Sequence, residues 1–207
     1  MWDHVVMSGD QTGERILEAA LQTILDFGVR RASVEEIARR AGVSHMTVYR
    51  RWPTKKDLLV ATLGTVTDSI LAAVDDEVAA LDDYEDRFVA GFTGIYWRVR
   101  THPMLSRTLE TDPEAVLPAL TTGAGPALEL AVNYLAGHIA DTARHGGVEI
   151  DDPQGLAEIF VRLTHSLVLT QRVREPLTSR ADAERYARQH LLPLALAMVR
   201  PVDVSAR

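Results

Sequence analysis

The 207-residue chain is 46% hydrophobic and 25% charged, with a mean hydropathy of −0.03, values typical of a soluble globular protein that buries a core. The absence of cysteine excludes disulfides and thiolate metal sites. Residues 1–10 carry two aspartates and no continuous apolar run, so they do not resemble a signal peptide. The uncharged stretch 115–128 is too short to span a bilayer and is broken by prolines and glycines. We therefore expect a cytoplasmic protein with no membrane partner.

The charge is distributed unevenly along the chain. The formal net charge is −7, yet residues 30–56 contain eight basic and two acidic side chains, a local charge of +6 that leaves −13 for the remainder. A compact basic segment within an acidic protein is typical of a nucleic-acid-binding domain. A charge run by itself is more often a solvated surface, so this segment needs a structural context before it indicates DNA.

The N-terminal part of the chain reads as helices with an apolar period of 3.6 residues. The first predicted helix covers 12–27, and Gly28 after it can adopt the left-handed conformation that ends a helix. The second begins after Ser33, a favourable N-cap residue, with Glu36 three residues later as in a capping box. We expect Gly42 to end this second helix.

Two further helices follow that glycine. Ser44 caps a short third helix, which ends before Trp52 and Pro53, and a fourth helix begins at Thr54 and continues to about residue 78. Trp52 lies beside the basic cluster, where it either stacks on a base or packs between the third and fourth helices. Packing is the commoner role for a tryptophan in such a place.

The remaining residues predict a second, larger helical domain. From the apolar periodicity and the positions of proline and glycine, the expected helices cover 84–100, 104–110, 113–122, 126–145, 153–169 and 181–199. The last of these contains Pro193, which lacks a backbone N–H and should kink the helix. No stretch alternates convincingly with the period of a strand, so the expected fold class is all-α.

The segment 33–59, SVEEIARRAGVSHMTVYRRWPTKKDLL, has the physical features of a helix-turn-helix. Its first helix presents Ile37 and Ala38 on an apolar face, where the small alanine allows a close approach to a neighbouring helix. Gly42 makes the turn, and Val48 is the buried residue of the second helix. The side chains left free to face a DNA groove are His45, Met46, Thr47, Tyr49 and Arg50.

At these positions the chain resembles the N-terminal domain of TetR-family repressors. The resemblance covers about a quarter of the chain. The matching residues are Arg15-Ile16-Leu17, Ala20, Gly28, Ser33-Val34, Ile37-Ala38, Ala41-Gly42-Val43-Ser44, Thr47-Val48-Tyr49, Trp52-Pro53, Lys55 and Leu58-Leu59.

The resemblance implies a one-component transcriptional regulator with an N-terminal three-helix helix-turn-helix DNA-binding domain plus a C-terminal helical ligand-binding and dimerisation domain. It divides the chain into a flexible tail at 1–11, a DNA-binding domain at 12–58 and an effector-binding and dimerisation domain at 59–200. The expected partners are a double-stranded DNA operator, a small-molecule effector and a second copy of the chain, paired through 153–169 and 181–199. The expected function is a repressor that releases a palindromic operator when a small apolar or aromatic ligand binds the C-terminal domain, with no enzymatic activity and no cofactor.

The same resemblance assigns roles to individual residues near the turn. It implies phosphate contacts by Thr47, Tyr49 and Lys55 and base reading by the helix 44–50. Family members often have Gly, Ala or Pro at the position of Met46, so base reading by this residue does not follow from the resemblance. Without the resemblance, the sequence favours a phosphate contact and a core position for Tyr49 about equally. The predicted DNA-binding residues are Ser33, Ser44, His45, Met46, Thr47, Tyr49, Arg50, Arg51 and Lys55.

Aromatic side chains at helical spacing mark the candidate ligand site. Such a stripe is more often ordinary core, but the resemblance implies an apolar cavity between the helices of this domain. A few polar residues nearby could orient a ligand, although each alone is more often a core or surface residue. The predicted ligand-binding residues are Phe88, Phe92, Tyr96, Trp97, His102, Leu105, Leu128, Thr164 and His165.

The sequence contains no motif typical of a metal site or of the common enzyme classes. The seven histidines form no metal-binding spacing, so we expect no metal site. Nucleophile elbows, phosphate-binding loops and dinucleotide fingerprints are missing from the sequence as well. Two other function classes stay open at this stage. A catalytic helical bundle would need clustered inward-facing acids, and an architectural or activator DNA-binding protein would need no ligand cavity.

Overall fold

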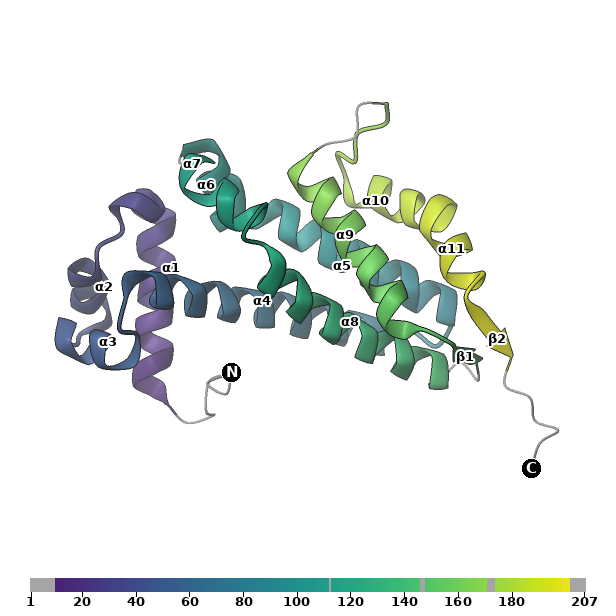
Figure 1. Cartoon of the computed structure of the whole chain (residues 1–207), viewed down its shortest axis with the longest axis horizontal. Coiled ribbons are helices and arrows are strands. Elements are labelled where there is room, and N and C mark those ends of the chain that lie inside the picture. Colours follow the sequence, from purple (N-terminus) through teal and green to yellow (C-terminus); the bar gives the residue numbers. More distant parts are fainter. Residues whose placement is uncertain (1–9, 112, 146–147, 171–173, 202–207) are drawn as a thin grey trace. The chain divides into compact units, whose positions relative to one another are not determined.

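The computed structural model describes residues 10–111, 113–145, 148–170 and 174–201 of the chain (Figure 1). The helices are α1 Gln11–Arg31, α2 Val34–Ala41, α3 His45–Arg51, α4 Lys55–Ala79, α5 Tyr84–Thr101, α6 Pro103–Thr111, α7 Pro113–Leu120, α8 Gly125–His145, α9 Pro153–Leu169, α10 Arg180–Tyr186, the π-helical turn η1 Ala187–Leu191 and α11 Leu192–Leu196. Two short strands, β1 Val148–Ile150 and β2 Val199–Pro201, complete the described elements. The predicted all-α class is confirmed, since helices make up nearly all of the fold.

The chain divides into two compact units. We call the first, Met1–Ser69 with His102–Leu120, the head, and the second, Ile70–Thr101 with Thr121–Arg207, the body. Each unit has its own cluster of buried apolar side chains, drawn in the head mainly from α1, α2 and α3 and in the body from α5 and α8 to α11. Helices α6 and α7 belong to the head although they follow α5 in sequence.

Two glycines of the head interrupt or end its helices. Gly28 has φ 81° and ψ 162° and interrupts the helical conformation of α1, because a residue with a side chain rarely adopts this backbone geometry. Gly42 has φ 66° and ends α2, and its backbone N–H donates to carbonyls of the preceding turn. Gly28 therefore interrupts α1, which continues to Arg31 instead of ending at residue 27 as predicted, whereas Gly42 ends α2; in the described residues, these two glycines have a positive φ.

The body is held together by aromatic and aliphatic packing around α5. Helix α8 packs along α9, and α5 lies against α9 and α10. The ring of Phe88 meets that of Phe160 edge to face, with 4.9 Å between ring centres, and Phe92 and Tyr96 stack in parallel planes at 6.0 Å. Leu156 is fully buried within the same cluster. Successive turns of α5 thus bind the body helices together.

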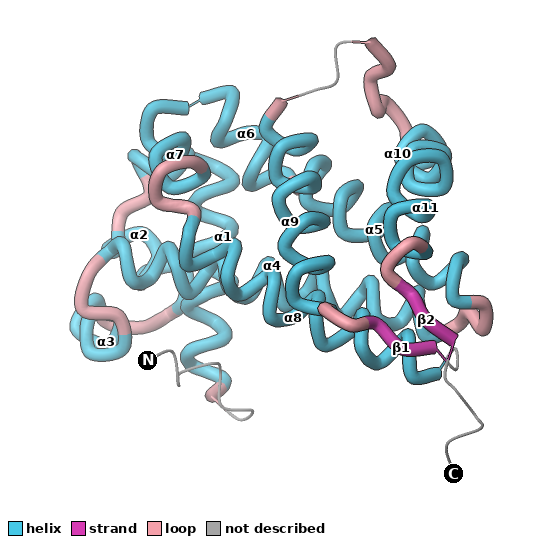
Figure 2. Tube along the Cα trace, turned by 45° about the vertical axis from the view of Figure 1, so that its right-hand side comes forward, coloured by secondary structure: helices cyan, strands magenta, loops and turns pink. Residues whose placement is uncertain are grey.

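The C-terminal segment differs from the single kinked helix predicted over 181–199. The structure has α10, then the π-helical turn η1, then α11, and the chain leaves the helix before β2. Pro193 follows the π turn, where the wider backbone accommodates a residue that lacks an N–H and crowds the carbonyl four residues earlier. Strand β2 pairs antiparallel with β1 in Figure 2, with Glu149 opposite Arg200. Strands of three residues are too short to show alternation in a sequence.

Helix α4 has a composition that the sequence analysis overlooked. It is long enough and apolar enough, with a mean hydropathy of 1.5 in its most apolar stretch, to cross a membrane as far as length and composition go. Helices inside soluble proteins also reach these values. Leu58 and Thr62 of α4 are fully buried, and Leu58 belongs to the head cluster.

Candidate nucleic-acid interface

The core of the helix-turn-helix fixes α3 against α2. Ile37, Ala38 and Val48 are at most 2% exposed and belong to the head cluster. The guanidinium of Arg15 on α1 donates to the carbonyl of Ala41 at the end of α2, which satisfies a backbone acceptor that the helix itself leaves free. The Gly42 turn and this packing hold α3 at a defined angle, as the sequence predicts for a helix-turn-helix.

The start of α3 is fixed by a side-chain cap. Ser44 Oγ accepts a hydrogen bond from the backbone N–H of Thr47 at 3.2 Å, and the two hydroxyls lie 2.9 Å apart. The cap satisfies one of the free N–H groups at the helix start. Ser33 caps α2 in the same way through the N–H of Glu36, at 3.2 Å. The two predicted N-caps are therefore confirmed.

The outer face of α3 carries the residues predicted to meet DNA. Met46 is 66% exposed and Tyr49 38% exposed, and His45 and Arg50 are also exposed. The rings of His45 and Tyr49 meet edge to face, with 6.4 Å between their centres. The buried Val48 and this outer face divide the short helix into a packed side and a free side.

Several cations of the basic segment are already paired. The carboxylate of Glu36 accepts from Arg39 and Arg40 at 2.6–2.7 Å, and Arg40 also contacts Asp26 at 2.6 Å. Hydrogen bonds from Arg39 first and Arg40 second lower the pKa of Glu36 to about 2. This use of the carboxylate replaces the second half of the capping box predicted at Ser33. The local charge of +6 therefore overstates the free positive charge of the segment.

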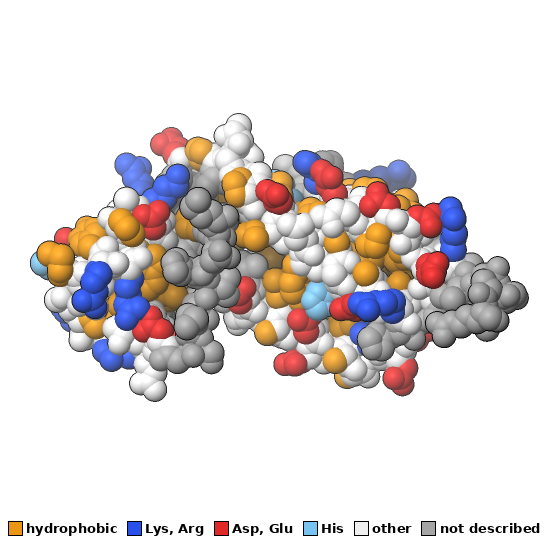
Figure 3. Space-filling view, turned by 60° about the horizontal axis from the view of Figure 1, so that its bottom comes forward, with side chains coloured by type: hydrophobic (Ala, Val, Ile, Leu, Met, Phe, Trp, Pro, Cys, Tyr) orange, Lys and Arg blue, Asp and Glu red, His pale blue; other side chains and the backbone are white. Residues whose placement is uncertain are grey.

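Two of the predicted DNA contacts, Arg51 and Lys55, also have partners within the head. Arg51 pairs with Asp10, and the ammonium of Lys55 donates to the carbonyls of Val29 at 2.9 Å and Arg30 at 3.2 Å. An ammonium has three donors, so Lys55 keeps one for a phosphate. Figure 3 shows Lys and Arg side chains among apolar ones on the head, at the left of the view.

By contrast, Arg50 makes no ion pair or hydrogen bond with any residue that the structure describes, and it is exposed on α3. The base-reading and phosphate roles of the nine residues stay predictions. Trp52 is partly buried and packs against the head cluster, in keeping with the packing role rather than base stacking.

The predicted ligand residues lie in both units. Phe92 and Tyr96 are 7% and 2% exposed in the body cluster, and Phe88 and Trp97 pack against it. The structure therefore brings the four aromatic residues together within the body. The other three body residues are partly exposed, on α8 and α9: Leu128, Thr164 and His165.

His102 and Leu105 are placed in the head, at the start of α6. Nδ1 of His102 accepts from the N–H of Met104 at 3.2 Å, and partial burial lowers the pKa of this imidazole. Both the residues in the head and those in the body stay predictions as ligand contacts.

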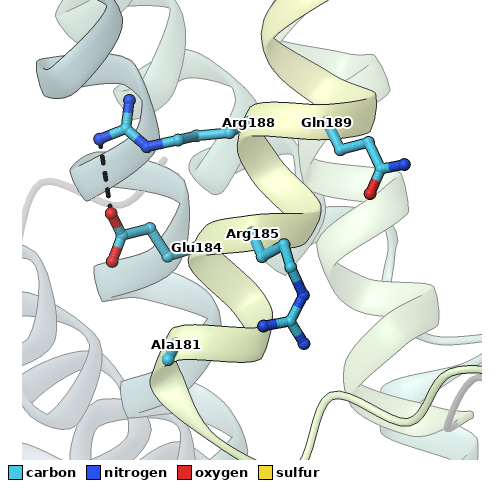
Figure 4. Close-up of a pocket in the computed structure, with 5 residues that line it drawn as sticks. All are labelled: Ala181, Glu184, Arg185, Arg188 and Gln189. Atoms are coloured by element: carbon cyan, nitrogen blue, oxygen red, sulfur yellow. Dashed lines mark hydrogen bonds and ion pairs between the residues drawn. The ribbon is translucent and has the colours of Figure 1, made fainter.

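Two surface hollows are lined by other residues. One lies on the outer side of α10 and η1, where Figure 4 shows Glu184 paired with Arg188 at 3.4 Å. The other lies on the head, between α1 and α2, beside Arg15 and Arg40. Neither hollow is lined by a predicted ligand residue. In the described part of the chain, no three His, Asp or Glu side chains gather as a metal site would require.

Three polar features of the body escaped the sequence analysis. Thr93 is 2% exposed, and its hydroxyl has no hydrogen-bond partner among the residues that the structure describes. Tyr134 donates to Asp75 at 2.7 Å beside the ring of His138, and burial together with this carboxylate raises the pKa of the phenol. The third is Glu77, whose carboxylate is shared by two arginines (Arg98 on α5, at 3.0 Å, and Arg180 on α10). The spacing of Thr93 from Val89 and Trp97 could have placed it on the aromatic face, but the other two join residues far apart in sequence.

Comparison with known proteins settles the family. Residues 16–62, which include α2, the turn and α3, match the family described as bacterial regulatory proteins, tetR family. An HTH-type transcriptional regulator of Mycobacterium bovis is 32% identical over 164 residues, which span 78% of this chain and 84% of that protein. The chain belongs to the tetR family. It is accordingly a DNA-binding transcriptional regulator and not an enzyme.

Other tetR-family proteins are similar to parts or to the fold of this chain. The DNA-binding transcriptional repressor TetR of Mycobacteroides abscessus is 35% identical over 116 residues, 56% of this chain and 54% of that protein. The crystal structure of the repressor AlkX from Dietzia sp. is similar with a TM-score of 0.70 at 19% identity, covering 90% of this chain and 98% of that one. At 19% identity, the similarity to AlkX shows a shared fold and nothing more.

Proposed function

We propose that this tetR-family regulator is a cytoplasmic, homodimeric repressor that releases a palindromic operator when a small apolar or aromatic ligand binds its body. DNA binding is assigned to residues 12–58, and effector binding and dimerisation to residues 59–200. The observation that carries the proposal is the free face of α3, held on a packed and capped helix-turn-helix. A recognition helix of this kind places its first residues against base edges.

The assignment of roles follows the chemistry of that face. His45 and Arg50 carry donors that match acceptors on base edges, whereas Thr47, Tyr49 and Lys55 suit phosphate oxygens. The freedom of the Arg50 guanidinium from partners in the described chain favours a base contact, because no internal bond must be broken first. Ser33, Ser44 and Arg51 complete the proposed interface at the helix starts and its flank.

The proposed palindromic operator requires a dimer, because two identical half-sites are matched by two chains related by a two-fold axis. Such an axis brings the same surface of both chains together. Apolar side chains on the two helical segments predicted to pair are exposed on the single chain: Ile159 is 39% exposed on α9, and Leu194 and Leu196 are 38% and 40% exposed on α11. Leu163 and Leu191 lie on the same segments but are poor markers of this interface. Leu163 is only partly exposed, and Leu191 is 3% exposed within its own core.

The aromatic cluster of the body favours an apolar or aromatic effector. The buried hydroxyl of Thr93, on the helix that carries these aromatic residues, has no partner in the described part of the chain, so a hydrogen-bonding group on the effector would satisfy this polar atom. The Dietzia repressor, of similar fold, is implicated in biodegradation of n-alkanes, which is in keeping with an apolar effector here. The Mycobacteroides relative is a repressor, which favours repression over activation.

The proposal is tested by coupling between ligand and operator. Native mass spectrometry of the purified protein against apolar and aromatic compounds identifies a binder, which is then titrated calorimetrically with and without operator DNA. We expect the operator to weaken ligand binding by a factor between about 5 and 150, because a coupling free energy of about 1–3 kcal/mol acts equally in both directions. Equal affinities in the two titrations would contradict ligand-controlled release. A reporter with the operator beside its promoter should be silenced by the protein; stimulation would indicate an activator.

A further inference from the structure

Met46 stands out among the side chains of α3 because the packing of the head does not explain it. It is 66% exposed, more than any other large apolar side chain in the described chain, and it is the second residue of the helix. A methionine side chain that is mostly exposed to water contributes little to the stability of the head through burial. Its neighbour Val48, 1% exposed, already anchors the helix in the core.

The geometry places this side chain at the end of α3 that a recognition helix directs toward base edges. The Ser44 cap fixes the first turn, with Oγ accepting from the N–H of Thr47 at 3.2 Å. Met46 lies between these two residues in sequence, so its backbone position is fixed while its unbranched side chain stays adaptable. It follows directly after His45 in the sequence, and Arg50 stands four residues further on in α3.

The chemistry of the thioether limits what it can recognise. It has no charge with which to bind a phosphate and no hydrogen to donate, and its sulfur is only a weak acceptor. Base edges in the major groove present donors, acceptors and one apolar group, the 5-methyl group of thymine. An exposed methionine at this place has the thymine methyl group as its complementary partner.

We propose that Met46 is a specificity-determining residue that recognises a thymine in each operator half-site through contact with its 5-methyl group. The inference rests on the proposed use of α3 as the recognition helix. It goes further by naming the base and the atoms that this residue distinguishes, at a position where the family pattern offers no guidance. The thymine lies beside the base pairs that His45 and Arg50 contact.

The test compares thymidine with deoxyuridine, which differs from it only by the absence of the 5-methyl group on the base. A duplex selected by the wild-type protein from a random pool is synthesised with each thymine replaced in turn. Binding is measured at one fixed salt concentration for wild type, Met46→Ala and Met46→Leu, with Leu63→Ala as the control. Leu63 is 45% exposed on α4 of the head, so its loss removes a similar surface side chain outside α3.

We expect deoxyuridine at one position of each half-site to weaken wild-type binding about fourfold per methyl group, the value expected for one buried methyl. In Met46→Ala the ratio between thymine and deoxyuridine duplexes should fall to about 1, whereas Met46→Leu and Leu63→Ala should keep the preference. The variants should melt like wild type, since the side chains removed are exposed.

Three outcomes would overturn the inference. These are the absence of thymine from the selected half-sites, equal binding of all deoxyuridine duplexes by wild type, and an unchanged ratio in Met46→Ala. If the protein selects a sequence but one of these three results is found, the thymine contact of Met46 is refuted, whereas the proposed DNA recognition by α3 is not. A pool with no enriched sequence would overturn both this inference and the proposed function.

Discussion

Single residues of α3 separate into those that hold the helix and those left free to meet DNA. We expect Arg50→Ala to lose about 1–3 kcal/mol of discrimination at the base it contacts, because an unpaired guanidinium on the exposed face is suited to base acceptors. Tyr49→Ala should instead weaken binding to all duplexes by a similar factor, since a phosphate contact carries no sequence information. Titrations against the operator and a scrambled duplex measure both effects. Uniform weakening by Arg50→Ala would contradict its base-reading role.

A second prediction at the residue scale concerns acid stability. Glu36 has its pKa lowered from 4.5 to about 2 by Arg39 and Arg40, so it stabilises the folded head fully above its unfolded pKa. That contribution should disappear as the pH falls from about 4.5 to about 2. Glu36→Gln should therefore melt below wild type at neutral pH and converge with it near pH 2. Parallel melting curves of the two proteins across this pH range would contradict the role of Glu36.

Local spacing explains which residues were predictable. Ser33, Gly42 and Val48 were identified correctly because a cap, a positive φ and a buried face each depend on a few neighbouring residues. The partners of Glu36 were not predicted, because the backbone of Ser33 and the two arginines compete for one carboxylate, which accepts from Arg39 and Arg40. The unpaired hydroxyl of Thr93 depends on packing that no spacing reveals.

At the scale of elements, Glu77 joins three helices of the body. Its carboxylate, on a side chain 28% exposed, pairs with Arg98 of α5 and Arg180 of α10. We expect Glu77→Gln to lower the free energy of unfolding by about 1 kcal/mol, because the partly buried guanidinium of Arg98 loses its anion, while the loss at the exposed Arg180 is screened by solvent. Glu184→Gln breaks an exposed pair with Arg188 and should change stability by less than about 0.5 kcal/mol. Urea unfolding compares the variants; equal effects would argue against a special role for Glu77.

Helix positions were largely predictable, and the end of the chain was not. The predicted range 153–169 coincides with α9, because Asp152 and Pro153 start the helix with strong local signals. Beyond Tyr186 the local pattern stays helical while the backbone widens into η1 and then enters β2. Pairing with β1, about fifty residues earlier, decides where this segment ends, and such pairing leaves no local trace in sequence.

For the whole molecule, the proposed dimer predicts a specific weak point. Ile159→Glu would place a charge at an apolar position that pairing should bury, so we expect the variant to be a monomer at micromolar concentration. Leu63→Glu, on the exposed surface of the head, should leave the dimer unchanged and serves as the control. Sedimentation velocity measures the state of each protein. A wild-type monomer, or a dimeric Ile159→Glu variant, would contradict pairing through α9.

The most direct test of the account is selection of binding sites by the intact wild-type protein from random DNA duplexes at moderate salt. In the proposed dimer, two copies of α3 related by a two-fold axis would reach successive turns of the major groove, roughly 34–36 Å apart. The account therefore predicts enrichment of one palindromic sequence whose half-sites are centred about 10–10.5 base pairs apart. A pool without an enriched sequence, or an enriched sequence without two-fold symmetry, would contradict it.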